Sequence, residues 1–169
     1  ATKQWSDDAS DPMEEIANAK ETVRAACGVV PRVLVVGASV LHALSKHDAL
    51  RGALSANERK TLLSQEQIRH LLDVDEIIVG AAVSTPDGKK QTADIWGKFA
   101  SLIVRPGVAS EGNDEGMPSF GYTFRRHGMP VVDRFEAVGG KVEYARYTDN
   151  RKAAVVGSMC GILIEKAIA

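Results

Sequence analysis

Three short runs of apolar residues constrain the fold of this chain more than any other feature. They occupy residues 33–36, 77–83 and 101–104. Short, continuous runs that are rich in β-branched residues and end at Gly, Pro or polar residues are typical of strands buried on both faces. The sequence therefore predicts an α+β domain with a mixed central sheet built from these three segments.

Helices are predicted to flank this sheet. Asp11 suits an N-cap, Pro12 the first helical position and Gly28 the end of a helix over residues 12–27. Its apolar residues recur at spacings of three and four, which gives the helix one buried face. They are Ile16, Ala19, Val23 and Cys27.

Two further helices are predicted before residue 73. A short one follows the first strand over residues 40–47, and residues 48–63 are expected to form a surface loop. Ser64 and Gln67 then form a capping-box pattern, which predicts a helix that buries Ile68, Leu71 and Leu72.

The second half of the chain is richer in strand patterns. Phe120, Tyr122 and Phe124 alternate with other residues, which predicts a half-buried strand. Strands are also expected over residues 131–138 and 142–147, on either side of a Gly139-Gly140 turn. The glycine-rich, acidic segment 107–118 is expected to be a loop.

Charge and cysteine content exclude several classes of protein. The chain has 21 basic and 22 acidic residues, so bulk charge does not attract it to nucleic acid or an anionic membrane. The most apolar stretch, residues 153–168, is interrupted by glycine and charge, so no membrane partner is expected. Cys27 and Cys160 are far apart in sequence, with no CxxC; buried free thiols are the favoured interpretation and a disulfide is the alternative.

Motifs that carry catalysis or ligand binding are missing from the sequence. No glycine-rich phosphate loop occurs, and the 157–161 segment lacks the spacing of a nucleophile elbow, so it is interpreted as a close-packed strand or helix. His42 and His47 are five residues apart, not the four that places two ligands on one helical face, and His70 and His127 stand alone. We therefore predict no catalytic, cofactor-binding or metal-ligating residues, no cofactor and no enzyme.

Two small basic patches remain, Arg125-Arg126-His127 and Arg151-Lys152. Such patches usually form a solvated face. The alternative is contact with an acidic neighbour or with nucleic acid.

The order of these elements resembles the major capsid proteins of tailed phages. Trp5 and Ser10-Asp11-Pro12 lead into the first helix, and Pro31 leads into the first buried strand. Further along, the same order continues in motifs that also resemble this family. They are Trp96-Gly97 before an apolar strand, Phe120-Gly121-Tyr122-Thr123-Phe124, and Asp149-Asn150-Arg151-Lys152 before the apolar end.

The resemblance covers the chain from Trp5 to its end and implies the phage major capsid-like fold named for the Hong Kong ninety-seven phage. It implies that residues 1–169 are a capsid subunit fragment: the axial domain, with peripheral-domain segments at the ends. In that family an extended N-terminal arm, a long hairpin loop and a spine helix come first. They are expected to be absent here, because no such region precedes Trp5.

The function that the resemblance implies is a structural subunit of a phage or prophage icosahedral head. Such a subunit self-assembles in the host bacterial cytoplasm and ends up in the virion capsid. Its expected partners are other copies of itself in hexamers and pentamers, then scaffold or decoration proteins and, indirectly, the packaged DNA.

Two alternatives stay open at the level of sequence. One is an encapsulin-like shell subunit, which has the same fold but encloses cargo instead of DNA. The other is a small α/β enzyme or ligand-binding domain with a pocket after Val36-Gly37. That pocket needs a cluster of titratable residues, and only His42 and His47 are near it in sequence.

Overall fold

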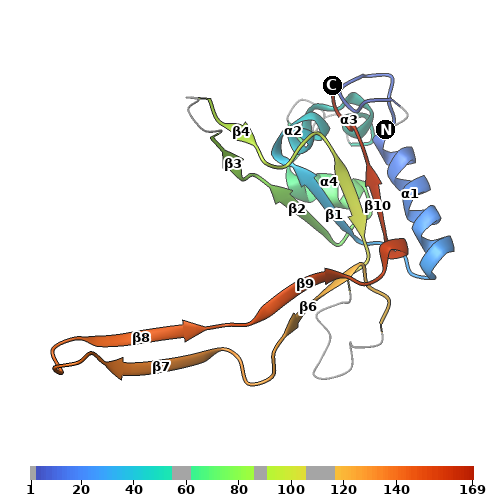
Figure 1. Ribbon diagram of the computed structural model, residues 1–169. Helices are drawn as coiled ribbons and strands as arrows, with labels where there is room; N and C mark the ends of the chain where they lie inside the picture. The colour runs from blue at the N-terminus through green and yellow to red at the C-terminus, as the bar shows by residue number, and fades with distance from the viewer. Residues whose placement is uncertain (1–2, 55–61, 86–90, 106–116) are drawn as a thin grey trace. The chain divides into compact units, whose positions relative to one another are not determined.

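The computed structural model describes residues 3–54, 62–85, 91–105 and 117–169 (Figure 1). It divides into two compact units. Unit 1 comprises Ala1–Phe120 and Gly157–Ala169, and unit 2 comprises Gly121–Val156. Most of the predicted 107–118 loop lies outside the described residues.

Unit 1 holds all the described helices and the larger sheet. Its helical segments are α1 (Pro12–Cys27), α2 (Ala38–Lys46), α3 (Asp48–Gly52), α4 (Gln65–Leu71) and the 3-10 turn η3 (Ser158–Cys160). Its strands are β1 (Val33–Gly37), β2 (Glu76–Gly80), β3 (Val83–Ser84), β4 (Ala93–Asp94), β5 (Ala100–Ile103) and β10 (Gly161–Ile164).

The central sheet has the strand order β10-β5-β1-β2. Strand β1 pairs with β2 in parallel and with β5 antiparallel, and β5 pairs antiparallel with β10. The prediction that the three apolar runs share one mixed sheet is therefore confirmed. The final apolar stretch contributes β10, the fourth strand.

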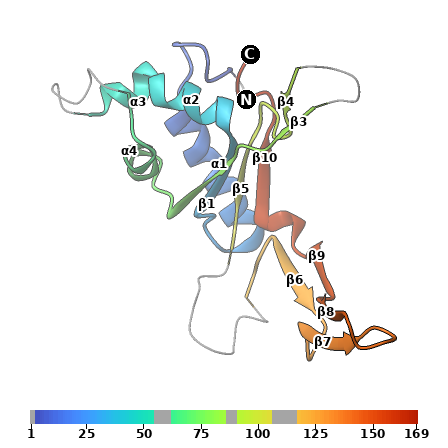
Figure 2. The ribbon, with the colours of Figure 1, turned by 90° about the vertical axis from the view of Figure 1, so that its left-hand side faces the viewer.

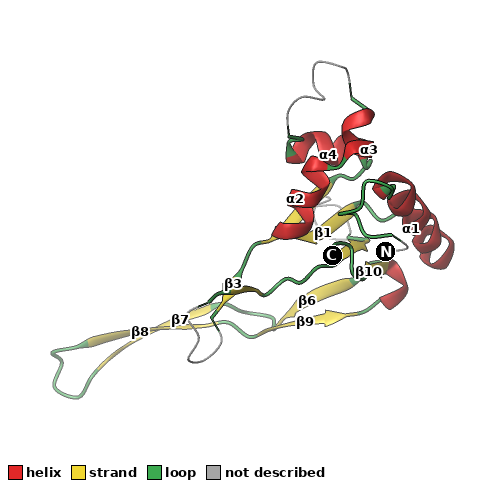
Figure 3. Cartoon of the chain, turned by 90° about the horizontal axis from the view of Figure 1, so that it is seen from above, coloured by secondary structure: helices red, strands yellow, loops and turns green. Residues whose placement is uncertain are grey.

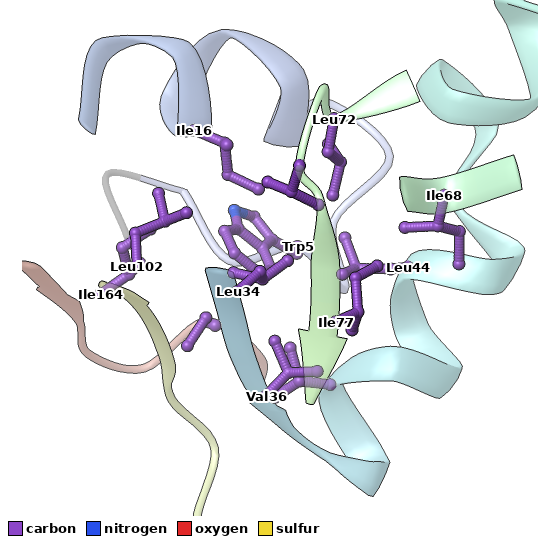
Figure 4. Packing of buried hydrophobic residues seen from close by; sticks show 14 of the residues in the cluster. Trp5, Ile16, Leu34, Val36, Leu44, Ile68, Leu72, Ile77, Leu102 and Ile164 are labelled. Atoms are coloured by element: carbon purple, nitrogen blue, oxygen red, sulfur yellow. The ribbon is translucent and has the colours of Figure 1, made fainter. Parts of the chain in front are cut away.

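One face of this sheet carries the main core. Leu34 lies opposite Ile77 on one side and Leu102 on the other, and cross-strand partners point to the same face. Side chains of α1, α2 and α4 pack against this face and complete the core. Figure 2 shows these helices on one side of the sheet. Figure 4 shows the packing, to which the helices contribute Ile16, Leu44 and Ile68.

The helix ends follow the predicted capping signals. The Asp11 carboxylate accepts hydrogen bonds from the backbone N–H groups of Met13 and Glu14, at 3.0 and 3.1 Å. Gly28 adopts φ +79° and its N–H donates to the Arg24 carbonyl, so glycine ends α1 as predicted. Both hydrogen bonds of the Ser64–Gln67 capping box are present at the start of α4.

Two boundaries differ from the sequence predictions. The segment predicted as a loop over residues 48–63 begins with α3, because Leu50 is fully buried in the core and the His47 ring caps the helix. The second strand ends at Gly80 and does not reach Val83. Val83 pairs instead with Asp94 in a separate two-stranded sheet, β3 with β4.

Gly80 offers a sharp test of the packing beside β2. A Cβ atom at this position would lie 2.2 Å from Cγ of Trp96, so Gly80→Ala must displace the indole. Overpacking of this kind costs about 1–3 kcal/mol, and chemical denaturation measures that loss. Gly52→Ala is the matched control, because nothing lies within 4 Å of its Cβ position, and we expect it to be neutral or slightly stabilising. Equal stability of the two variants would contradict this placement of Trp96.

Unit 2 is a long β-ribbon, called the ribbon below. Strand β6 (Gly121–Arg125) pairs with β9 (Arg151–Val155), and β7 (Val131–Glu136) pairs with β8 (Glu143–Thr148), both antiparallel. Figure 3 shows β7 and β8 continuing the two strands of the β6–β9 pair. Gly139 and Gly140 both have positive φ in the turn at the tip, as predicted for this dipeptide.

Candidate assembly surface

The four histidines of the chain are either exposed or part of the structural framework. His42, His70 and His127 are exposed, and His47 is buried. Nε2 of His47 lies 2.9 Å from the Ser10 hydroxyl oxygen, and Nδ1 accepts a hydrogen bond from Ala49 N–H at 3.2 Å. His47 therefore joins the N-terminal segment to the start of α3, a structural task.

Two other places could hold a small ligand, the end of β1 at Gly37 and a hollow beside α1. Beside Gly37, where an α/β enzyme would have its pocket, the carbonyl oxygens of Gly97 and Trp96 lie 2.8 and 3.3 Å from the position of a Cβ atom. Backbone oxygens therefore lie where a side chain at residue 37 would begin. A shallow hollow of about 370 Å³ lies beside α1, but the Lys20 ammonium at its edge donates to the Leu72 carbonyl and pairs with Asp73.

Within the described residues, no group of three His, Cys, Asp or Glu side chains is placed to hold a metal ion. In the same part of the chain, no helix combines the length and apolar character needed to cross a membrane.

The ribbon is the most unusual surface of the molecule. No residue from Gly121 to Val156 belongs to the buried core. Yet ten of the 18 large apolar side chains that are exposed in the described residues lie in this stretch. The prediction that Phe120, Tyr122 and Phe124 form a half-buried strand is wrong for the outer part, where Phe124 is 57% exposed. An isolated two-stranded ribbon is only marginally stable in water, so this surface suits a protein partner.

The two faces of the outer ribbon have different chemistry. On one face Phe135 stacks on Tyr144, with ring centroids 5.3 Å apart, beside an Asp133–Arg146 ion pair of 2.7 Å. On the opposite face Val132 lies directly across from Tyr147, and both are more than 60% exposed. Tyrosine, phenylalanine and arginine are the side chains enriched at the centres of protein interfaces.

At its base the ribbon contains a like-charge pair that is compensated within the chain. Arg125 lies directly opposite Arg151, and the half-buried Asp149 carboxylate lies 3.0 and 3.7 Å from the two guanidinium groups. Arg125 and Arg151, one residue from each predicted basic patch, are thus paired with Asp149 within the chain. Four other cations of the ribbon have no carboxylate partner within the described part of the chain: Arg126, Arg134, Lys141 and Lys152.

The charge of the chain is divided unevenly between the two units. The ribbon has seven Lys and Arg against four Asp and Glu, which gives a net charge of +3. Unit 1 has 14 basic and 18 acidic residues and a net charge of −4. The near-neutral total is therefore the sum of two units whose net charges have opposite sign. Counting charges by segment of the sequence would have revealed this division.

Comparisons with known proteins point in one direction. The chain is 33% identical over 168 residues to the major capsid protein of Burkholderia phage BcepMu, covering 97% of the chain and 53% of that protein. It is 26% identical over 172 residues to the major capsid protein of Pseudomonas phage JBD67, covering 99% of the chain and 54% of that protein. The chain thus spans about half the length of the curated relatives it matches. No family model matches it.

A solved structure has a closely similar fold. It is a phage-related protein from Bordetella bronchiseptica RB50, which superposes with a TM-score of 0.77 at 25% sequence identity. The match covers 99% of this chain and 55% of that one. Both units of the chain therefore have counterparts in a phage-related protein.

Proposed function

Because the chain is a homologue of phage major capsid proteins over nearly its whole length, we propose that it is part of a structural subunit that builds the icosahedral head of a phage or prophage. The observation that carries this proposal is the 33% identity to a named major capsid protein across 97% of the chain. The mixed sheet and one-sided helices agree with the predicted capsid-like fold, and the structural neighbour is itself phage-related.

The two units support a division of labour within such a subunit. We assign unit 1 to the axial domain, near the centre of a capsomer, and the ribbon to part of the peripheral domain. The support is that unit 1 has a complete core of its own whereas the ribbon has none. An element without a core gains most from contact with neighbouring copies.

The partner proposed for the ribbon is another copy of the same chain. Unit 1 carries a net charge of −4 and the ribbon +3, so the ribbon of one copy and unit 1 of the next are electrostatically complementary. Exposed aromatic and aliphatic side chains on both ribbon faces provide the area that a contact needs. The small basic patches are then explained by an acidic neighbour and not by direct binding of DNA.

With this role the protein belongs to the virion and is a non-enzymatic component. Hexamers and pentamers of the subunit, scaffold or decoration proteins and indirect contact with packaged DNA complete the proposal. Phage heads are favoured over cargo-enclosing shells because the named relatives come from phages.

Electron microscopy and sedimentation of two proteins, this 169-residue chain and the full-length subunit from the phage genome, test the function. We expect the chain to stay monomeric or form small oligomers, because few weak contacts do not hold a lattice that many contacts hold together. The full-length subunit, co-expressed with its neighbouring phage genes, is expected to form closed shells. A full-length protein that stays monomeric under all these conditions argues against a capsid role.

A further inference from the structure

The two cysteines of the chain meet in a small apolar cluster of unit 1. Cys27 is the last residue of α1 and Cys160 the last residue of η3, and these two elements pack against each other. In Figure 1, the short coil just before β10 lies beside the end of α1. The cluster around the two thiols consists of Val23, Val104, Phe120 and Ile162.

The backbone around Cys160 is held firmly. Its N–H donates to the Gly157 carbonyl at 2.9 Å, and its carbonyl accepts from Val104 N–H at 2.8 Å. Gly157 itself has no room for a side chain, because a Cβ atom would lie 2.6 Å from the Ser119 carbonyl oxygen. Cys160 is therefore presented to α1 in a fixed position.

The two thiols differ in access to solvent and act on each other. Cys160 is buried, whereas Cys27 is partly exposed and donates to the Val29 carbonyl at 3.4 Å. Burial raises the pKa of the Cys160 thiol, and the neighbouring Cys27 thiol raises this pKa further. Two thiols in one apolar cluster, one partly exposed and one buried, are arranged for stepwise thiol–disulfide exchange.

We propose that Cys27 and Cys160 form a reversible disulfide when the chain meets a small-molecule disulfide such as oxidised glutathione. The Cys27 thiolate attacks one glutathione sulfur, and the first glutathione leaves as a thiolate that takes up a proton. Cys160 then loses its proton and attacks the Cys27 sulfur of the mixed disulfide, which expels the second glutathione. One glutathione disulfide is reduced to two thiols while the two cysteines are oxidised.

The bond closes a loop from residue 27 to residue 160, which contains the whole ribbon. It joins the end of α1 to η3, the 3-10 turn that follows the ribbon, and a long closed loop restricts the unfolded chain strongly. The time at which the disulfide forms rests on the proposed head function. Both thiols stay reduced during assembly in the cell and become oxidised after the particle is released. The disulfide would then stabilise the subunit at the stage when no repair is available.

The test uses the 169-residue chain, oxidised glutathione and intact-mass and peptide mass spectrometry without reductant. We expect the loss of two hydrogens and a linked Cys27–Cys160 peptide, together with a rise in Tm of roughly 5–15 °C that dithiothreitol reverses. Two single variants separate the steps. Cys160→Ala is expected to stop at one glutathione on Cys27, and Cys27→Ser is expected to leave the folded chain unmodified, because Cys160 is buried.

Other outcomes overturn the proposal. Two glutathione adducts without a cross-link, dimers linked through Cys27, or an unchanged mass in the folded chain each rule out the intramolecular disulfide. The double variant Cys27→Ser, Cys160→Ala, placed in the full-length subunit, keeps the two questions apart. Its assembly into shells under reducing conditions tests the capsid role whatever the outcome for the disulfide.

Discussion

A full-length subunit carrying Val132→Lys and Tyr147→Glu is expected to fold but to fail to form shells. These two side chains lie directly opposite each other on the ribbon and are 62% and 63% exposed. The double substitution replaces an apolar cross-strand pair with an oppositely charged one, which preserves the pairing of β7 with β8. What it removes is the apolar surface offered to a neighbouring copy.

The expected size of the effect follows from that surface. Burying a large apolar side chain contributes about 1.5–3 kcal/mol, so losing two from each contact weakens it by a factor of a hundred or more. Because every subunit of a closed lattice makes the same contact, the loss of contact free energy is repeated at every subunit of the shell. Electron microscopy is expected to show free subunits or small oligomers.

Two controls make this result interpretable. Thermal unfolding of the variant is expected to match the wild type in unit 1, because the ribbon contributes nothing to the core. Leu62→Lys is the matched control in unit 1, since Leu62 is 60% exposed and the substitution changes polarity in the same way. Normal shells from the ribbon variant, or an equal loss of assembly in Leu62→Lys, would show that the ribbon is not a special contact.

The second large effect is expected at Trp5, where Trp5→Ala should destabilise unit 1 by about 3–5 kcal/mol. The indole is 1% exposed and packs with the central core, and its N–H donates to Glu15 Oε2 at 2.7 Å. The Trp5 backbone N–H also donates to the Ala167 carbonyl at 2.6 Å, so this residue holds the two ends of unit 1 together. A loss of this size is a large fraction of the stability of a typical domain.

Denaturation in urea, followed by circular dichroism, measures the loss. Trp5→Phe is the matched control, because it keeps an aromatic ring in the core but removes the hydrogen bond to Glu15 and the smaller part of the indole's buried volume. We expect this variant to lose about 1–2 kcal/mol. If Trp5→Ala costs no more than Trp5→Phe, the N-terminal segment does not fill the core as described.

Local signals in the sequence determined the beginning and end of α1, the capping box of α4 and the existence of the three core strands. Asp11, Pro12 and Gly28 act within a few residues of themselves, through backbone N–H groups and φ, so their effect is readable from the sequence. The motifs that begin at Trp5 resemble the capsid family in their order along the chain, and the comparisons with phage proteins agree with that resemblance.

The exposed faces of the ribbon were harder to predict. An alternating pattern shows which side chains share a face, but it does not show what covers that face. Phe124, Val132 and Tyr147 have the pattern of half-buried strands, yet all three are more than half exposed. Only the pairing of β7 with β8 in a unit that contains no buried residue reveals that neither face of the ribbon has a core of its own.

Tertiary structure alone decided which distant segments meet. Strand β10 joins the sheet beside β5, about 60 residues earlier in the chain, and nothing in either strand specifies that partner. Cys27 and Cys160 are 133 positions apart, and their separation in sequence favoured two buried free thiols over a disulfide. The packing of α1 against η3 brings them together because the chain leaves unit 1 after Phe120, builds the ribbon and returns at Gly157. Contacts of that kind depend on where a long excursion ends, which no local pattern encodes.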